Sequence, residues 1–310
     1  MSDRKSAQSM NYWIFTVKDA RIGTEKKKKG IEIYTQRMSD AFWGLREKIS
    51  NRDYIEKGDF VVFYLAGGQG HKFLGTCTLA SNYYELGREE KKMLCHAPFF
   101  QSDHGVKLAE IEVWDEPVSI FPLIKSLSFI EDPKVWGTYL QGSIHRISES
   151  DYSVIVGSAM SREILELSDM KKPVLTDETS RTMASRRVRD AVFMEQVKKI
   201  YDYGCAVCGK RRFSRSNHPE VESSHIKPKG EEGSDDLRNG IALCRLHHWA
   251  FDEGLFSIKD DYSIVVENRI RNVKDYVEIF AFANRKIRLP NAYAPHYVFL
   301  REHRKRHGFA

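Results

Sequence analysis

The chain has 310 residues, of which 41% are apolar, 30% charged and 12% aromatic. This composition is typical of a folded soluble protein and too apolar for a disordered one. The best uncharged apolar run, Phe60–Ala66, is much shorter than the ~18 residues that a membrane helix needs. The first ten residues contain no apolar core of the signal-peptide type. We therefore expect a cytoplasmic protein with no membrane partner.

Charge is distributed unevenly along the chain. The net charge is +6, and residues 184–310 carry seven more Lys and Arg than Asp and Glu, whereas residues 1–183 are close to neutral. A basic region gains affinity for a polyanion by releasing counterions, so the second part of the chain suits a nucleic acid. A role of the surplus in solubility is the alternative.

Strand-like segments dominate the first third of the chain. Asn11–Val17, Gly58–Leu65, Lys72–Leu79 and Val106–Val113 are rich in the β-branched and aromatic residues that favour strands. These segments predict a β-rich first domain.

A polar segment with a proline, Ser168–Met183, follows this β-rich region and predicts a domain boundary. From about Ser185, apolar residues recur at helical spacing, so we expect a helix there. We predict a first domain at residues 10–165, a linker at 166–183 and a second domain at 184–310.

Two short motifs in the second domain have the spacing of metal ligands. Cys205 and Cys208 are separated by two residues, and so are Cys244 and His247. Two such pairs can direct four ligands to one tetrahedral Zn²⁺ ion. A site with four protein ligands has no open position, so this zinc would stabilise the fold rather than take part in chemistry.

Residues suited to hydrolysis lie between and after these pairs. His225 and Asn239 lie between them, and His248 and Asp252 come just after. His248 and Asp252 are four residues apart, so on a helix they share one face and could share a cation. Hydrolysis of a phosphodiester needs a base to activate water and a divalent ion to stabilise charge. A histidine suits the first task because its ordinary pKa is about 6.5.

The segment from about Arg186 to Phe309 resembles the HNH nuclease domain, a ββα-metal fold, in the version found in modification-dependent restriction endonucleases. The resemblance depends on SHIKP, RNGIALCRLHHWAFDEGLFSI and the later IRLPNAYAPHYVFLREHRKRHGF. It implies that His225 is the general base, that Asn239 braces the loop beneath it, and that His248 binds a catalytic Mg²⁺ or Mn²⁺. It also implies that the two Cys/His pairs bind the structural zinc.

One position departs from the HNH pattern. Many HNH enzymes have an Asp just before the base histidine as a second metal ligand, and here that residue is Ser224. Asp252, or Glu222 on the same strand face as Ser224, could supply the missing carboxylate. His303 is expected at the surface or facing a phosphate rather than in catalysis.

The segment Asn11–Val156 resembles the EVE domain, a PUA-like β-barrel with flanking helices that is related to the YTH readers of modified bases. The motifs are NYWIFTV, AFWGL, GDFVVFYLAGG, KFLGTCTLAS and GSIHRISESDYSVI. Domains of this kind hold a flipped-out modified base between aromatic rings. By resemblance the candidate base-binding residues are Trp43 first, then Tyr83, Tyr84, Asn82 and Trp13. A role in the packed core is the alternative for both tryptophans.

Together the sequence predicts an α+β protein of two domains that acts as a modification-dependent, type IV-like restriction endonuclease. The first domain would recognise 5-methylcytosine or 5-hydroxymethylcytosine in double-stranded DNA by base flipping, and the second would hydrolyse the backbone. Such an enzyme suits defence against phage with modified cytosines. Because two strands need two active sites, we expect a homodimer, at least on DNA. The alternative is a non-catalytic or RNA-directed protein that binds modified nucleic acid.

Overall fold

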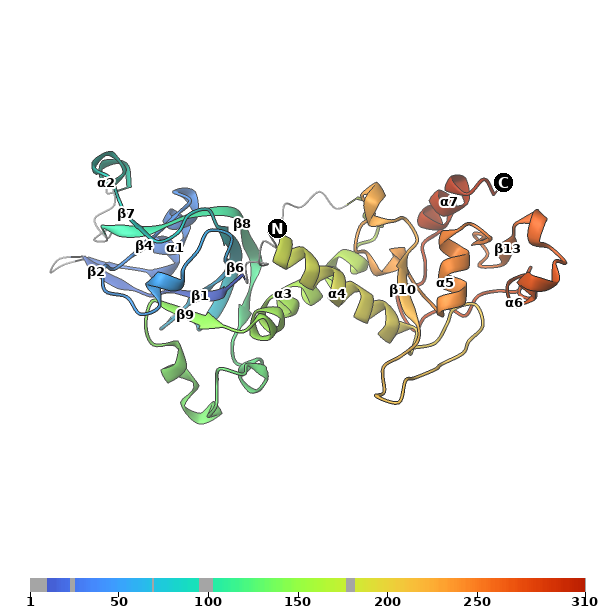
Figure 1. The fold of residues 1–310 in the computed structure, drawn as a ribbon, viewed down its shortest axis with the longest axis horizontal. Helices are drawn as coiled ribbons and strands as arrows, with labels where there is room; N and C mark the ends of the chain where they lie inside the picture. Colours follow the sequence, from blue (N-terminus) through green and yellow to red (C-terminus); the bar gives the residue numbers. More distant parts are fainter. Residues whose placement is uncertain (1–9, 23–25, 69, 95–102, 177–181, 310) are drawn as a thin grey trace, which may run out of the picture. The chain divides into compact units, whose positions relative to one another are not determined.

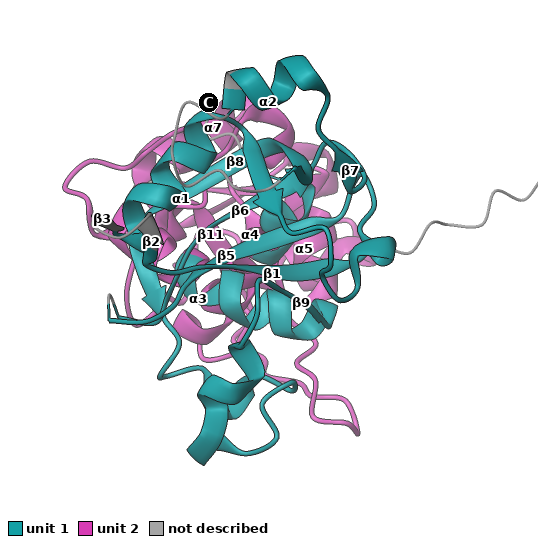
Figure 2. Cartoon of the chain, turned by 90° about the vertical axis from the view of Figure 1, so that its left-hand side faces the viewer, with its two compact units in different colours: residues 1–159, 180–188 teal, residues 160–179, 189–310 magenta. Residues whose placement is uncertain are grey.

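The computed structural model describes residues 10–22, 26–68, 70–94, 103–176 and 182–309. It divides into two compact units, which Figure 2 shows in different colours. The first unit consists of residues 1–159 and 180–188, and the second of residues 160–179 and 189–310. None of the helices in the described ranges is long and apolar enough to cross a membrane.

The first unit is rich in strands and contains the short α-helices α1 and α2, together with the first part of α3 and the start of α4 (Figure 1). Its elements are β1 (Tyr12–Val17), β2 (Ala20–Ile22), β3 (Lys26–Lys28), α1 (Gly30–Ser39), β4 (Phe42–Leu45), η1 (Arg52–Tyr54), β5 (Phe60–Leu65), β6 (Lys72–Leu79), β7 (Tyr84–Glu85), α2 (Arg88–Leu94), β8 (His104–Ser119), η2 (Ile124–Ser126), η3 (Pro133–Leu140), β9 (Ile144–Ile147) and α3 (Glu149–Asp169).

One curled sheet organises this unit, in the order β4-β8-β6-β5-β1-β9 with β7 beside β8. Strand β1 runs parallel to β5 and antiparallel to β9, whereas β5, β6 and β8 pair antiparallel. Among the described strands this path ends at β4 and β9, so the sheet forms a half-barrel rather than a closed ring. The four predicted strands are confirmed as β1, β5, β6 and β8, of which β8 is longer than predicted.

The core of the first unit lies between the sheet and α1. Ile33 and Tyr34 of α1 pack with strand residues that include Phe63 and Trp43. The rings of Tyr34 and Phe63 meet edge to face, with centroids 5.5 Å apart. All four residues of β4 are buried, and Trp43 and Leu45, which share one face of the strand, belong to this core.

The second unit contains the end of α3 and most of α4 together with short strands and helices. Its elements are α4 (Met183–Ile200), β10 (Glu222–His225), η4 (Lys229–Glu231), η5 (Leu237–Asn239), β11 (Gly240–Leu243), α5 (Arg245–Asp252), β12 (Phe256–Ile258), β13 (Ile264–Val266), η6 (Asn268–Ile270), η7 (Lys274–Tyr276), α6 (Val277–Phe280) and α7 (Tyr297–Arg306).

Strands β10 and β11 pair antiparallel, and α5 follows β11 directly, which gives a ββα arrangement. The helix expected from about Ser185 is confirmed as α4. This helix packs closely on β11 at Gly240, where an added Cβ would lie 2.3 Å from Cγ2 of Val197. Gly240 pairs in register with His225, so the close approach of α4 brings that helix to the end of β10.

Candidate active site and zinc centre

Two pairs of metal-ligand side chains meet beside the ββα arrangement. Cys205 and Cys208 lie in the turn after α4, Cys244 is the N-cap of α5, and His247 lies in the first turn of that helix. Their ligand atoms all lie within 4.8 Å of one another. The Nδ1 atom of His247 is 3.0 Å from Sγ of Cys244 and 3.6 Å from Sγ of Cys205. The fold thus brings together the residues that the spacing predicts.

This zinc cluster (Cys205, Cys208, Cys244 and His247) fits a tetrahedral ion. Ligands at the usual Zn–S and Zn–N lengths stand about 3.5 Å apart in a tetrahedral shell. Nε2 of His247 donates a hydrogen bond to a backbone carbonyl at 3.2 Å, which leaves Nδ1 free to bind a metal. Contacts with the neighbouring thiols hold the pKa of Cys208 well below its usual value, which favours a thiolate. The cluster is therefore compatible with a structural zinc.

His225 occupies the end of β10 at one wall of a cleft. The ring of Phe193 from α4 stacks on its imidazole, with centroids 4.0 Å apart and planes 11° apart. Nε2 of His225 lies 3.0 Å from a carboxylate oxygen of Asp235. A carboxylate only accepts, so in the neutral ring Nε2 carries the proton and Nδ1 keeps its lone pair. Such a nitrogen can accept a proton from water.

Asp235 is a site residue that the sequence did not reveal. Its side chain is completely buried, yet it contacts Nε of Arg189 and Nζ of Lys229 at 2.7 Å each, in addition to His225. Burial acts to raise the pKa of this carboxyl, but hydrogen bonds from His225 and Lys229 and the charge of Arg189 outweigh it and hold the pKa well below its usual value. The only signal in the sequence was the acidic pair in GSDDLRNG, a polar segment of the kind that usually faces solvent.

Asn239 is also fully buried. Its side chain joins the segment at Lys227, just after His225, to the loop at Ser234. Its Nδ2 donates to the backbone carbonyls of Lys227 and Ser234 at 3.0 and 2.9 Å, and its Oδ1 accepts from the amide of Lys227 at 2.8 Å. The side chain therefore sits where a brace for the loop beneath His225 is expected, and all its contacts are to backbone groups rather than to the cleft.

His248 projects from α5 between two carboxylates. Its Nδ1 is 2.7 Å from Oε2 of Glu222, and its Nε2 is 3.4 Å from Oδ2 of Asp252. The two carboxylates that the sequence analysis named as alternative metal ligands thus both lie beside this ring. The hydroxyl of Ser224 is 3.4 Å from Oδ1 of Asp252. The ligand atoms of His248, Glu222 and Asp252 are more widely spaced than those of the zinc cluster. Among the described residues, the zinc cluster is the only group of three or more potential ligands whose atoms all lie within 4.8 Å of one another. Oxygen and imidazole donors suit a hard divalent cation.

A single cleft of ≈ 440 Å³ connects these groups, because His225, His248 and Asp252 all line it. Lys229 and Arg306 add positive charge to its walls. The arrangement places a potential base, a potential cation site and basic side chains around one space, as hydrolysis of a phosphodiester requires. We call this space the histidine cleft.

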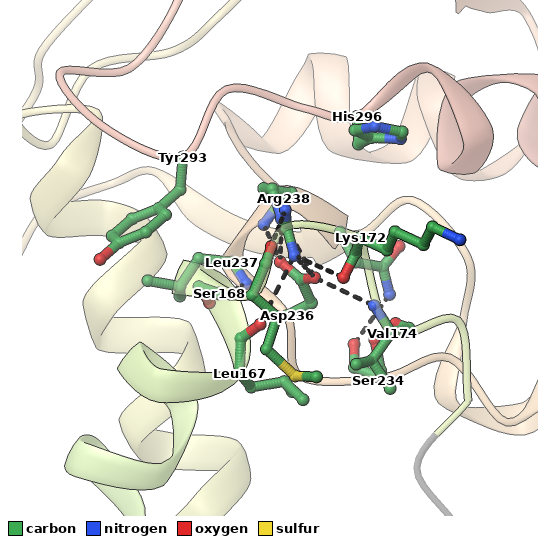
Figure 3. A network of polar contacts seen from close by, with 12 residues as sticks. Leu167, Ser168, Lys172, Val174, Ser234, Asp236, Leu237, Arg238, Tyr293 and His296 are labelled. Carbon is green, nitrogen blue, oxygen red and sulfur yellow. Dashed lines mark hydrogen bonds and ion pairs between the residues drawn. The ribbon is translucent and has the colours of Figure 1, made fainter.

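The loop 233–239, which carries the buried carboxylate and amide described above, is held by a polar network (Figure 3). Arg238 contacts both carboxylate oxygens of Asp236 at 2.6–3.1 Å. The same guanidinium donates to three backbone carbonyls of segment 167–174 at 2.9 and 3.4 Å. Asp236 also accepts a hydrogen bond from the amide of Val174 at 3.3 Å. These contacts hold the loop against segment 167–174.

His303 does not lie at the surface, as the sequence suggested, but is buried with 2% of its area exposed. Its ring stacks on Phe251 at a centroid distance of 3.7 Å. Nδ1 is 2.8 Å from the hydroxyl of Ser257, and Nε2 donates to the carbonyl of Phe251 at 3.1 Å. His303 lies on the buried face of α7 with Phe299 and Leu300. The many charged residues around it in the sequence made this position hard to predict.

In the first unit, the two tryptophans predicted to hold a base are in the core. Trp43 is 1% exposed, and its ring lies 5.0 Å from Phe63 and 5.7 Å from Phe15. Trp13 is completely buried and donates from Nε1 to Asp59 at 2.8 Å. In this conformation neither ring has a face open to a base.

The remaining candidates for base binding lie near β7. The ring of Tyr83 stacks on His104 at 5.4 Å, and its hydroxyl donates to the carbonyl of Arg46 at 3.1 Å. The hydroxyl of Tyr84 donates to a carboxylate at 3.1 Å, and Oδ1 of Asn82 accepts from a backbone amide at 2.8 Å. Residues 95–102, which follow these candidates in the chain, lie outside the described residues. Tyr83 packs against the core cluster that contains both tryptophans.

A pocket of ≈ 370 Å³ in the first unit has other walls. Phe129 and Tyr139 contribute rings, Asn51 contributes an amide, and residues 141–147 form one side. His145, on this side, has a buried Nε2 atom without a hydrogen-bond partner in the described structure. The pocket combines aromatic and polar side chains, as a site for a planar ligand would.

Comparison with family models identifies both units. Residues 11–158 match the EVE domain model, and residues 205–259 match the HNH endonuclease model. The second match contains the zinc cluster and His225, Asn239 and His248. Both matches confirm the resemblances that the motifs predict. No curated protein matches the chain.

The similar solved structures are remote in sequence. A hypothetical protein from Leishmania major is 14% identical, with a TM-score of 0.35, over 51% of this chain and 99% of that one. The modification-dependent TagI restriction endonuclease is 16% identical, with a TM-score of 0.31, over 84% and 69%. Human THYN1, solved with DNA containing 5-methylcytosine, is 12% identical, with a TM-score of 0.35, over 48% and 97%. Scores this low carry no argument about function.

Proposed function

We propose that this chain, which contains an EVE domain and an HNH endonuclease domain, cuts double-stranded DNA that carries a modified cytosine. The EVE domain would bind the modified base after its extrusion from the duplex, and the HNH domain would hydrolyse the backbone. One observation carries the hydrolytic part of the proposal: His225 and His248 line the same cleft, each with a carboxylate beside it. The recognition part rests on the EVE match and on the pocket in that unit.

In the proposed reaction, His225 is the general base. Its Nδ1 accepts a proton from a water molecule while the water oxygen bonds to phosphorus. The bond from phosphorus to the 3′ oxygen then breaks, and the leaving oxygen takes a proton from solvent, which gives a 5′-phosphate and a 3′-hydroxyl. Asn239 holds the backbone next to the base through its bonds to Lys227.

We assign the cation ligands to His248 and Asp252. Nε2 of His248 and Oδ2 of Asp252 lie 3.4 Å apart, a separation that suits two ligands of one ion. Glu222 is at hydrogen-bond distance from Nδ1, 2.7 Å, so it suits a carboxylate that orients the ring. A divalent ion such as Mg²⁺ or Mn²⁺ supplies charge neutralisation at the phosphate when bound here.

We assign the modified base to the pocket of the first unit rather than to Trp43. The base would stack on Tyr139 or Phe129, since stacking on an aromatic ring provides much of the affinity for an extruded base. His145, whose Nε2 atom is buried without a hydrogen-bond partner in the described structure, also lines this pocket. Trp43 is unsuitable because core residues cover its ring.

Two features of the partner follow from this proposal. The basic charge of residues 184–310 suits contact with the DNA backbone. Each chain has one histidine cleft, so cutting both strands calls for two copies of the chain on one DNA molecule. We propose that such an enzyme acts in the cytoplasm against invading DNA with modified cytosines.

The test is digestion of matched plasmids that carry cytosine, 5-methylcytosine or 5-hydroxymethylcytosine, with Mg²⁺ or Mn²⁺. We expect cutting of at least one modified plasmid and little cutting of the unmodified one. Equal cutting of all three would identify a general nuclease. Binding of modified DNA without any cutting would identify a non-catalytic reader. A preference for modified RNA would show that the substrate is RNA.

A further inference from the structure

We propose that Asp235 is the positioning residue of the catalytic base: it holds the proton on Nε2 of His225, so that Nδ1 is the atom that receives the proton of water. The inference rests on the proposed function, because it concerns the base of that reaction. The two oxygens of this carboxylate have different partners. Oδ1 faces His225 at 3.0 Å, whereas Oδ2 faces Arg189 and Lys229 at 2.7 Å each.

The site of Asp235 keeps the carboxylate charged. Arg189 is 3% exposed and Asp235 is not exposed at all, so their ion pair is shielded from water. The pKa of the nearby Asp190 is raised, first by burial and then by the charge of Asp235. Asp235, which has a cation at 2.7 Å on each of two contacts, therefore keeps its charge. A charged acceptor fixes the tautomer of an imidazole more firmly than a neutral one does.

A purely structural role for Asp235 would be to neutralise Arg189, yet Arg189 has a second carboxylate available. Its Nη1 lies 3.0 Å from Glu163 of α3. The imidazole also has a second fixed contact, the stacked ring of Phe193 at 4.0 Å. The carboxylate and the phenyl ring together leave His225 one orientation, in which Nδ1 has no hydrogen-bond partner among the described residues. This is the arrangement that a general base needs.

The loop that carries Asp235 is held independently of the cleft. The Arg238–Asp236 pair and the backbone of segment 167–174 fix it on one side (Figure 3). Gly233 allows the loop to pass close to Lys227, because an added Cβ would lie 1.9 Å from the carbonyl oxygen of Lys227. The carboxylate therefore reaches His225 from a rigid support, as orientation of a base requires.

During the reaction, Asp235 would not gain the proton. The proton of water moves to Nδ1, the ring becomes an imidazolium, and the bond from Nε2–H to the carboxylate becomes charge-assisted. The carboxylate thus stabilises the positive ring as the bond to phosphorus forms. This contribution arises in the transition state, so it lowers the barrier rather than strengthening substrate binding.

The substitution Asp235→Asn separates this role from a structural one. Arg189 and Lys229 both donate, so they should retain the amide oxygen at the Oδ2 position. The amide NH₂ would then face Nε2 of His225, which must accept, and the proton would move to Nδ1. We expect single-turnover cleavage to slow by about 10²–10⁴-fold, the range seen when the partner of a metal-bound or catalytic histidine is changed. DNA binding and zinc content should not change.

Nuclear magnetic resonance of ¹⁵N-labelled histidine reads the tautomer directly and needs no cleavage. The full-length wild-type chain should show His225 with the proton on Nε2, and Asp235→Asn should show it on Nδ1. Asp236→Asn is the matched control, since it changes the adjacent buried carboxylate, which contacts Arg238 instead. This control should lower thermal stability and leave the tautomer of His225 unchanged.

A wild-type protein with the proton on Nδ1 would overturn the proposal, as would an Asp235→Asn variant that cuts at the wild-type rate. If the variant fails to fold, the wild-type spectrum decides alone. If the wild-type chain cuts no DNA, the proposed function fails, while the tautomer still tests whether Asp235 positions the ring.

Discussion

The two units differ in how well the residue types in the sequence indicate the candidate site. In the HNH unit, polar residues chosen from the sequence, such as His225 and His248, line one cleft with their partners beside them. In the EVE unit, Trp43 and Trp13 belong to the core, and the pocket is lined by other residues. Burying an ionisable group is costly without a partner, so clustered polar residues indicate a site, whereas an aromatic ring gains equally from a core.

The largest expected effect tests the zinc cluster. Cys205→Ser should remove zinc and unfold the HNH unit while the EVE unit stays folded, because binding of a structural zinc contributes directly to folding. Metal analysis and limited proteolysis of the full chain measure both results. Cys77→Ser is the control, since this thiol is buried in the EVE core, and its zinc content should equal that of the wild type. A folded, zinc-loaded Cys205→Ser protein would show that the ligand assignment is wrong.

The next effect tests His225 as the proposed general base. His225→Ala should slow cleavage by about 10²–10⁴-fold, the usual contribution of general acid–base catalysis, or abolish it. Zinc content and DNA binding should be retained. His218→Ala changes an exposed histidine on another loop and should cut normally. If His225→Ala cleaves DNA at the wild-type rate, hydrolysis does not take place in the histidine cleft.

A pair of substitutions sharpens the comparison inside the EVE unit. Tyr139→Ala should weaken binding of modified DNA by about 5–100-fold, because one base stack contributes ~1–3 kcal/mol, with little change for unmodified DNA. Trp43→Ala should instead lower the free energy of unfolding by about 3–5 kcal/mol, the cost of a large cavity. Binding assays and thermal unfolding distinguish the two. If Trp43→Ala stays stable and loses only the preference for modified DNA, our assignment of the pocket is wrong.

The smallest effect is a dependence of stability on pH. Burial, followed by the charge of His307, lowers the pKa of His303 to about 3. An unfolded chain protonates this ring below about 6.5, whereas the folded chain keeps it neutral. His303 therefore contributes its full stability above that pH and loses ~1.4 kcal/mol per unit as the pH falls toward the folded value.

The comparison with His303→Gln isolates this contribution, because the zinc cluster titrates alike in both proteins. Thermal unfolding should show that wild type loses stability faster than the variant between about pH 6 and 4. Identical slopes for the two proteins would mean that His303 is protonated in the folded state.

Most of the strand pattern and the zinc cluster could be predicted from the sequence, because alternation and ligand spacing are local properties. The four strands of the EVE unit and the helix at Met183–Ile200 follow from composition and periodicity. Asp235 could not be predicted in the same way. Its partners Arg189, His225 and Lys229 come from separate segments, and only the fold brings them to one carboxylate.

The pocket of the EVE unit could not be predicted for a related reason. Its walls combine residues 49–51 with residues from 129–147, two segments that are far apart in the sequence and share no common spacing. Trp43 was chosen by the resemblance to YTH readers of modified bases, whereas in the structure its ring belongs to the core that α1 covers.

His247 and His248 are neighbours in α5, and side chains of consecutive helical residues point about 100° apart. In the proposed enzyme, one turn of helix would thus bind the structural zinc with one imidazole and the catalytic divalent ion with the next. A chelator should therefore act in two stages, a rapid inhibition and a slow collapse. If adding Mg²⁺ alone restores cutting, the zinc has remained bound during the treatment.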